Sequence, residues 1–375
     1  MRSAERAAWR PTRRLATITA LLVLATGAPL PGYATDPPQP VTVATVQFEV
    51  RRELYRSPDR FQRAVEPLVE EAAGRGADLV VFPEYINVFL VASRYPGILE
   101  HADSVSGALA ALASRAGHPD LQALFSANAG WLSREVRRIW SSLAREHELT
   151  IVAGTTFEAA GGTPVPRTAS DSETRRTRAT TPGSDSPIAD QAREDGPTLY
   201  NRALVFGEDG ELVHVHEKAY LTPMEEDELG LTAGRARAAT LFDVDGVEMG
   251  ITICRDTYFE SWHGPLRGLD LWIDLRANGE PYSREVYERF LGTLPERVRE
   301  SSAVAGVNSS LTGTFWEMLW EGPSYVVDAG GRRVAQTPDV RGTRVLLMEL
   351  TPNELEDSWR LAGAIPSTNH PDRSR

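Results

Sequence analysis

The fold of this chain is constrained most by its apolar segments. Some of them have the pattern of a β-strand and others the spacing of a helix. Residues 41–48 (VTVATVQF) are rich in β-branched residues and follow a proline-rich stretch, which predicts a buried strand. Apolar side chains then recur at helical spacing from Phe61 to Ala73, after the helix start Ser57-Pro58. Residues 77–82 are apolar on both faces, as in strands that are covered on both sides. This order predicts an α/β fold with layered sheets.

The same two periods continue to residue 350. Ser133 is predicted to cap a second helix, and residues 150–155 (TIVAGT) predict a strand. Asp209-Gly210 and Asp245-Gly246 each lie between apolar runs, which predicts two hairpins, 202–216 and 240–253. Further strands are predicted at 269–275, 325–328, 332–335 and 344–350, and residues 283–307 are expected to be mostly helical. We therefore expect mixed sheets with helices packed outside them, in a single domain over 41–350.

The remaining segments are predicted to lie outside this core. Residues 1–34 place basic residues before a short apolar run and a small-residue site, the order of a secretory signal peptide, and residues 35–40 form a linker. Residues 159–195 are rich in Thr, Ser, Arg, Gly and Pro, which predicts a disordered insertion, and residues 351–375 are predicted to be a C-terminal tail. We expect export to the periplasm or the medium. The pair Arg13-Arg14 is compatible with export by the twin-arginine route. After cleavage no stable membrane insertion is expected; an uncleaved N-terminal anchor is the alternative.

Charge and cysteine usage narrow the class of partner. The net charge of −12 and the absence of a basic stripe argue against nucleic acid as a partner. Cys254 is the only cysteine, so it has no internal disulfide partner, and a free thiol in an exported protein has to be buried or used. His214-x-His216 has the spacing of a metal pair, but the seven histidines are scattered and do not predict a metal site.

Three residues that can carry chemistry each follow a predicted strand. Cys254 comes directly after the strand GITI, so a rigid element would hold the thiol on an exposed turn whose backbone N–H groups can face an oxyanion. Lys218 ends the strand 211–217 and can stabilise the same developing charge. Glu84 follows Pro83 at a carboxyl strand end, where desolvation would raise its pKa and suit it as a general base. Taken singly, each residue also fits a structural or surface position.

Together the three surrounding blocks resemble one family. VFPEY (81–85), HEKAYLTPMEE (216–226) and GITICRDTYFE (250–260) are similar to the catalytic blocks of the nitrilase superfamily of carbon–nitrogen hydrolases. ATVQF (44–48), YNRALVF (200–206), ERVRESSAVAGVN (296–308) and GPSYVVDAGG (322–331) extend the resemblance over roughly Val41 to Leu350. The spacing after Lys218 is nearest to the apolipoprotein N-acyltransferase branch. The resemblance implies a four-layer α-β-β-α sandwich for the domain at 41–350.

The resemblance also implies roles for the site residues. Glu84 would be the general base, Lys218 the oxyanion stabiliser and Cys254 the nucleophile, with Glu226 as a second active-site carboxylate and Glu225 as the neighbouring candidate. The chain departs from the family at Asp274–Asn278, where many members have a Pro-Thr/Ser-Asn-like turn that lines the substrate pocket. No metal or organic cofactor is implied.

The implied reaction is hydrolysis of a small-molecule, amide-type carbon–nitrogen bond through a thioester on the cysteine. Family members commonly pair subunits, so a homodimer or higher homo-oligomer is expected. The alternatives are nitrile hydrolysis, acyl transfer to an amine with the same triad, a non-catalytic binding protein on the same fold, and a papain-like enzyme in which His263 serves Cys254.

Overall fold

The computed structural model describes residues 39–160, 198–236, 241–353 and 358–365, all within one compact unit. Its first sheet has the strand order β5-β4-β3-β2-β1-β13-β14, and β1, β2 and β3 run parallel. The strands are β1 (Val41–Val50), β2 (Leu79–Val81), β3 (Thr150–Ala159), β4 (Leu199–Phe206), β5 (Leu212–Glu217), β13 (Arg344–Asn353) and β14 (Ser358–Ile365).

A second sheet has the order β6-β7-β8-β9-β11-β12, with β7, β8 and β9 parallel and β10 paired to the far end of β9. The end of β1 also pairs with β9, from Phe48↔Leu311 to Val50↔Gly313, and this joins the two sheets. The strands are β6 (Phe242–Val244), β7 (Val247–Ile253), β8 (Leu271–Arg276), β9 (Ala305–Phe315), β10 (Met318–Trp320), β11 (Tyr325–Asp328) and β12 (Arg333–Gln336).

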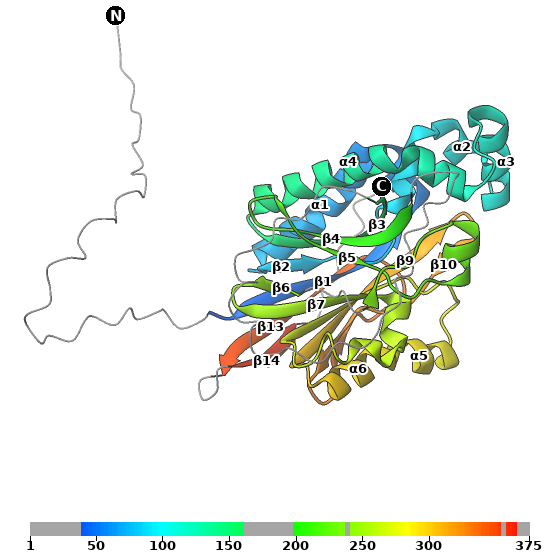
Figure 1. Cartoon of the computed structure of the whole chain (residues 1–375). Helices are drawn as coiled ribbons and strands as arrows, with labels where there is room; N and C mark the ends of the chain where they lie inside the picture. Colours follow the sequence, from blue (N-terminus) through cyan, green and yellow to red (C-terminus); the bar gives the residue numbers. More distant parts are fainter. Residues whose placement is uncertain (1–38, 161–197, 237–240, 354–357, 366–375) are drawn as a thin grey trace, which may run out of the picture. The chain divides into compact units, whose positions relative to one another are not determined.

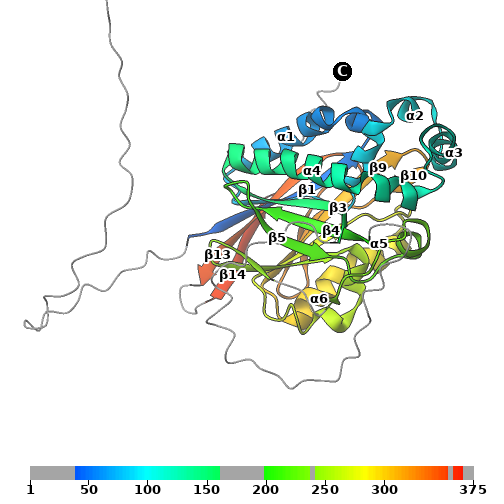
Figure 2. The same ribbon diagram turned by 45° about the horizontal axis from the view of Figure 1, so that its top comes forward.

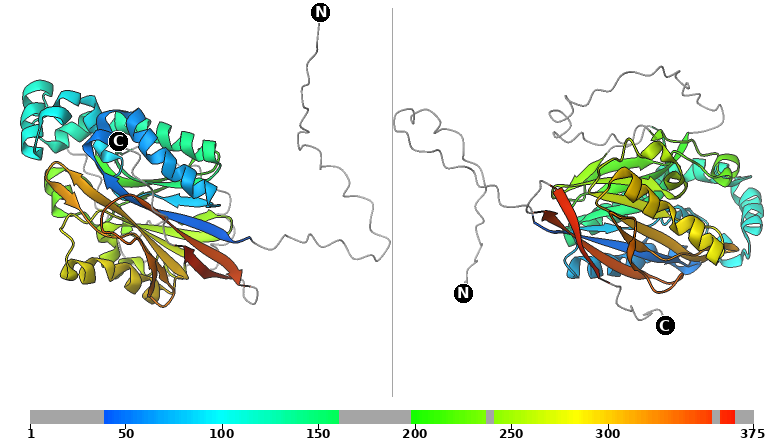
Figure 3. Two further views of the ribbon diagram at one scale, coloured as in Figure 1. Left: turned by 180° about the vertical axis from the view of Figure 1, so that it is seen from behind. Right: turned by 90° about the horizontal axis from the view of Figure 1, so that it is seen from below.

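Helices cover the outer face of each sheet (Figure 1). On the first sheet, α1 and α4 lie side by side over the strands (Figure 2). On the second, α5 and α6 cover the opposite outer face (Figure 3). The helices are α1 (Pro58–Gly74), α2 (Pro96–His101), α3 (Val105–Ala116), α4 (Leu121–His147), α5 (Arg284–Leu291) and α6 (Thr293–Ser301). The order of layers is therefore α-β-β-α, which confirms the predicted four-layer sandwich.

Strand alternation explains why three apolar cores separate these layers. Val41 and Val43 of β1 point between the sheets, whereas Val46 and Phe48 point toward α1 and α4. Ile273 of β8 likewise faces the first sheet. Its neighbour in sequence, Trp272, points to the opposite face and packs against α6. Both faces of the central strands are thus buried, which is why their sequences are nearly continuous apolar runs.

Most predicted elements are confirmed, and their ends differ for local reasons. The helix capped by Ser57 and the two Asp-Gly hairpins are present as predicted. The prediction that Ser133 caps a helix is wrong: α4 begins at Leu121, where the Asp120 side chain accepts from Ala123 N (2.7 Å). Ser133 lies inside α4 and donates to Glu158 Oε1 (2.6 Å).

The segment boundaries need two corrections. The predicted insertion starts inside β3, which runs to Ala159, and residues 161–197 lie outside those that the structure describes. The predicted C-terminal tail contains β14, which pairs antiparallel with β13 and packs Trp359 and Leu361 against the inter-sheet core. The predicted signal peptide and most of the linker also lie outside the described residues. None of the described helices is both long and apolar enough to cross a membrane.

Candidate active site

The loop after β2 places the Glu84 carboxylate at the carboxyl end of the first sheet. Pro83 ends the strand, and Tyr85 takes a positive φ of 62° while its N–H donates to Thr155 Oγ1 (2.9 Å). Gly154 makes this approach possible, because a Cβ at that position would lie 2.2 Å from the carbonyl oxygen of Pro83. Glu84 is fully buried as a result.

Lys218 follows β5 directly, and its ammonium group lies between two carboxylates. Its Nζ is 2.7 Å from Glu84 Oε1 and 2.9 Å from Glu225 Oε2, and the Lys218 side chain is 1% exposed. The strand register through the end of β5 holds, since His214, His216 and Lys218 are all buried. A buried lysine with two acidic neighbours keeps its charge, so the site contains a permanent cation.

The second carboxylate of the site is Glu225, and the placement of Glu226 there is wrong. Glu225 is fully buried and accepts from Thr222 N (2.8 Å) as well as from Lys218, whereas Glu226 is exposed. The difference arises in a π-helical turn at Met224–Glu228, in which Leu229 N donates to Met224 O five residues back. That turn directs the first of the two glutamates into the site and the second toward solvent.

Asn201 of β4 belongs to the site and was not anticipated from the sequence. Its Nδ2 donates to Glu84 Oε1 (3.0 Å) and to Glu225 Oε1 (2.8 Å), so the amide bridges the same two carboxylates as Lys218. Asn201 is fully buried. The available signal was an amide side chain in the strand segment YNRALVF, because a buried amide requires partners.

Cys254 occupies the turn at the end of β7 in a left-handed conformation, with φ of 48°. Asp256 fixes this turn: its carboxylate accepts from Ile253 N (3.1 Å) and, across the site, from Ala219 N (3.1 Å) and Tyr220 N (2.9 Å). The cysteine turn and the loop after Lys218 are therefore tied through one buried side chain. Arg255 also contacts that loop, since its Nη1 donates to Leu221 O.

A buried ion pair supports the cysteine turn from β8. Thr257 Oγ1 donates to the carbonyl oxygen of Cys254 (2.6 Å) and accepts from Arg276 Nη2 (3.0 Å). Arg276 Nη2 also lies 2.6 Å from Asp274 Oδ2, and both side chains are at most 1% exposed. Asp274 and Arg276 lie in the segment 274–278, where the sequence departs from the turn typical of the nitrilase superfamily. Through Thr257, Arg276 supports the backbone carbonyl of Cys254.

Burial and neighbouring charges set the protonation states of the site. Desolvation raises the pKa of Glu84 to about 7, although the Lys218 charge opposes it. Burial also raises the pKa of the Cys254 thiol to about 12, together with the charge of Glu84. Burial acts against the charge of Lys218, but Glu84 and Glu225 outweigh it and raise the lysine's pKa. Burial likewise opposes ionisation of Glu225, but the Lys218 charge and the Thr222 N–H lower its pKa overall.

This arrangement combines a neutral thiol, a carboxylate that titrates near neutrality and a fixed cation. Lys218 and Asn201 both donate to Glu84 Oε1, which leaves Glu84 Oε2 able to take a proton. The thiol and Glu84 lie near enough for each to shift the other's pKa. A thiol, a carboxylate and a cation, the kinds of group that nucleophilic catalysis uses, are thus assembled within one buried site.

Comparisons with known proteins agree with this geometry. The carbon-nitrogen hydrolase family model matches residues 42–263. No curated protein matches the chain significantly in sequence. Among solved structures, the chain is similar to an amidase from Nesterenkonia sp., with 16% identity, a TM-score of 0.55, and coverage of 85% of this chain and 94% of that one.

The chain is also similar to a mutant of the Nesterenkonia sp. AN1 amidase. That structure shows covalent addition of the acetamide moiety of fluoroacetamide at its active site cysteine. Its identity is 16%, its TM-score 0.54, and the coverage is 84% of this chain and 91% of that one. Another mutant of this amidase, described as from the nitrilase superfamily, has 15% identity, a TM-score of 0.52, and coverage of 82% and 90%. At these identities the structures show a shared fold. Because the family model spans more than half of its residues, the chain belongs to the carbon-nitrogen hydrolase family and is a hydrolase acting on carbon–nitrogen bonds.

Proposed function

We propose that this protein hydrolyses small-molecule amides through a thioester on Cys254, with Glu84 as general base and Lys218 as oxyanion stabiliser. The observation that carries the proposal is the placement of Lys218 Nζ between Glu84 and Glu225, next to the cysteine turn. A thiol with a pKa near 12 is not ionised at rest. It therefore needs a base at the moment of attack, and Glu84, with a pKa of about 7, can accept the proton.

Acylation follows from these positions. Cys254 Sγ attacks the carbonyl carbon while its proton passes to Glu84. Lys218 and the backbone N–H of Arg255 bind the oxygen that becomes negative. When the tetrahedral species collapses, the carbon–nitrogen bond breaks and Glu84 returns the proton to the departing amine. Water, deprotonated by Glu84, then attacks the thioester, releases the acid and restores the thiol.

Glu225 and Asn201 act as positioning residues in this scheme. Asn201 Nδ2 donates to Glu84 (3.0 Å), Glu225 accepts from Lys218 Nζ (3.1 Å), and both side chains are fully buried. Glu225 keeps Lys218 charged when Glu84 takes up the proton, so the oxyanion site does not lose its cation during the reaction. Asn201 fixes the positions of the two carboxylates relative to each other by donating to both.

The test is a panel of amides, N-carbamoyl compounds and nitriles, assayed for ammonia with and without hydroxylamine. A thioester predicts ammonia release in both conditions and hydroxamate only when hydroxylamine is present. Cys254→Ala is the control: it should abolish both products while costing no more than about 1–2 kcal/mol of stability. If no compound releases ammonia but an acyl group passes to an amine, acyl transfer is the activity instead.

Export and self-association stay predictions from the sequence. The segment that motivates export, residues 1–34, lies outside those described. Detection of the mature protein outside the cytoplasm, with its N-terminus determined by mass spectrometry, would test export, and sedimentation at several concentrations would test association.

A further inference from the structure

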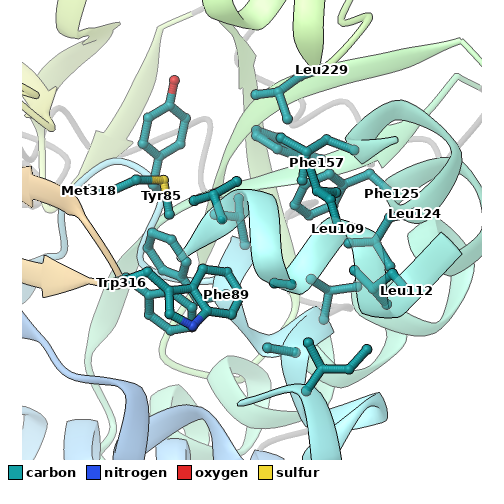
Figure 4. Close-up of a pocket in the computed structure, with 18 of the residues that line it drawn as sticks. Tyr85, Phe89, Leu109, Leu112, Leu124, Phe125, Phe157, Leu229, Trp316 and Met318 are labelled. Atoms are coloured by element: carbon teal, nitrogen blue, oxygen red, sulfur yellow. The ribbon is translucent and has the colours of Figure 1, made fainter. Parts of the chain in front are cut away.

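A cavity of about 110 Å³ lies next to the charged site. Its walls come from the segment between Glu84 and β3, namely the 3-10 helix Val88–Arg94, α2, α3 and the start of α4, and from the β9–β10 hairpin (Figure 4). The lining side chains are almost entirely hydrocarbon; they include Val91, Ile98, Leu112, Phe125, Phe315 and Trp320.

Tyr85 forms the wall that the cavity shares with the charged site. Its ring lines the cavity, and in Figure 4 its hydroxyl points away from the other labelled side chains. That hydroxyl hydrogen-bonds Glu225, and Lys218 Nζ lies 5.7 Å from the ring centroid. One side chain therefore contacts the apolar space on one side and the charged groups on the other.

Met224 marks the rim of the cavity beside the same carboxylate. It lines the cavity, directly precedes Glu225 and is 39% exposed. Only one other large hydrophobic residue in the described part of the chain, Val334, is exposed to this degree, and it lies on β12. Met224 therefore provides an apolar contact at the edge of the cavity, next to the charged site.

The lining limits what can bind there. A polar or charged group would lose its water without gaining a hydrogen bond, which is unfavourable. An engineered apolar cavity of about 150 Å³ in another protein binds benzene, so the space here suits a short alkyl chain or a single ring. Such a group could fill the cavity while a polar amide attached to it remains among Glu84, Lys218 and Cys254.

We propose that this cavity binds a hydrocarbon substituent of the substrate, a short alkyl chain or one aryl ring, whose amide is attacked by Cys254. The inference rests on the proposed function and adds the substrate class to it. The substituent belongs to either the acyl or the amine part of the amide, and the experiment has one arm for each.

In the first arm, kcat/KM is measured for linear amides from acetamide to octanamide by ammonia release. In the second, N-alkylacetamides with the same alkyl lengths are followed by release of the alkylamine. In one series, kcat/KM should rise about fourfold per methylene until the cavity is full. A flat or falling dependence in both series would overturn the assignment.

Two alanines of α3 provide a matched pair of variants. Ala108 is buried and lines the cavity, whereas Ala110 is exposed on the same helix. Ala108→Leu should reduce the preference for the six-carbon over the two-carbon member of the responding series at least about tenfold, the lower end for losing pocket contacts. Ala110→Leu should leave the preference unchanged. Equal profiles for the two variants would contradict the proposal.

A further variant and a binding measurement keep the result interpretable. If Ala108→Leu does not fold, Leu112→Ala enlarges the same cavity and should move the optimum to a longer chain; an unmoved optimum counts against the proposal. If no amide is turned over, the proposed function fails, and calorimetry of hexanamide and N-hexylacetamide with the Cys254→Ala protein then decides the cavity separately. Binding that is weakened by Ala108→Leu or by Leu112→Ala supports the cavity assignment, and absence of binding of both compounds overturns it.

Discussion

Replacement of Glu225 by glutamine tests the charge arrangement around Lys218, with Glu226→Gln as the matched control. Glu225 accepts hydrogen bonds from Lys218, from Asn201 and from both the N–H and the hydroxyl of Thr222. A glutamine has one acceptor oxygen, so its NH₂ group must face donors on one side of the site. Lys218 would still have Glu84 as a partner, but it would lose its second counter-charge.

The size of the effect follows from these contacts. Hydrogen bonds to a charged group contribute about 1.5–3 kcal/mol each, and some are retained by the amide oxygen. We expect a net loss of transition-state stabilisation of about 2–4 kcal/mol, which is a fall in kcat/KM of about 30- to 1000-fold. Glu226 is exposed, and its replacement should change kcat/KM by less than about twofold.

The assay is ammonia release from the best amide of the panel, at a fixed pH and with thermal unfolding of each variant measured in parallel. Glu225→Asp, which keeps the charge, should recover part of the lost activity. Equal losses in Glu225→Gln and Glu226→Gln, or full activity in folded Glu225→Gln, would refute the role of Glu225.

Three further predictions concern pH, the buried ion pair and the insertion. Because Glu84 must be ionised to act as base, kcat/KM should rise with pH through about 7. The raised pKa of Glu84 also stabilises the fold below the ordinary value of 4.5, and this contribution is lost as the pH rises to about 7. In urea unfolding measured at several pH values, Glu84→Gln should therefore flatten the pH dependence over this range. Arg276→Met should lower the free energy of unfolding by about 3–5 kcal/mol, measured by chemical denaturation, because it leaves Asp274 buried and unpaired. Arg276→Met combined with Asp274→Leu should lower it much less, and equal losses would show that the pair is not coupled. Replacing residues 161–197 by a short Gly/Ser turn should preserve activity, because Ala160 N already donates to Thr198 O (2.8 Å) across the ends of this segment. Each halving of a loop changes its closure free energy by only about 0.6 kcal/mol. Loss of activity in a folded protein would show that the segment contributes to the site.

The layered core was predictable because burial on both faces leaves a strong pattern. The runs at 41–48 and 77–82, and the helical stripe from Phe61 to Ala73, correspond to β1, β2 and α1. β14 was missed because only Trp359, Leu361 and Ala364 of this edge strand pack inward, too few to reveal a period. The start of α4 was missed because the residues 126–130 (SANAG), which are mostly small, interrupt the apolar stripe that Leu121, Leu124 and Phe125 begin.

The candidate site was predictable where a residue directly follows a strand. Glu84, Lys218 and Cys254 each follow the end of β2, β5 or β7 closely, so their sequence positions determine where they lie. Glu225 was not distinguishable from Glu226, since the choice depends on a π-helical turn whose extra residue per turn has no sequence signature here. Asn201 depends on a contact between β4 and two distant loops, which a pattern within one strand cannot reveal.

The thioester on Cys254 is tested most directly by intact-protein mass spectrometry of the enzyme, quenched in acid during turnover of an amide. The expected result is a new species heavier by the acyl group less one hydrogen, mapped to the peptide that contains Cys254 and absent from Cys254→Ala. Ammonia release by folded Cys254→Ala at the wild-type rate, or an acyl group on a residue other than Cys254, would contradict a cysteine-dependent hydrolysis.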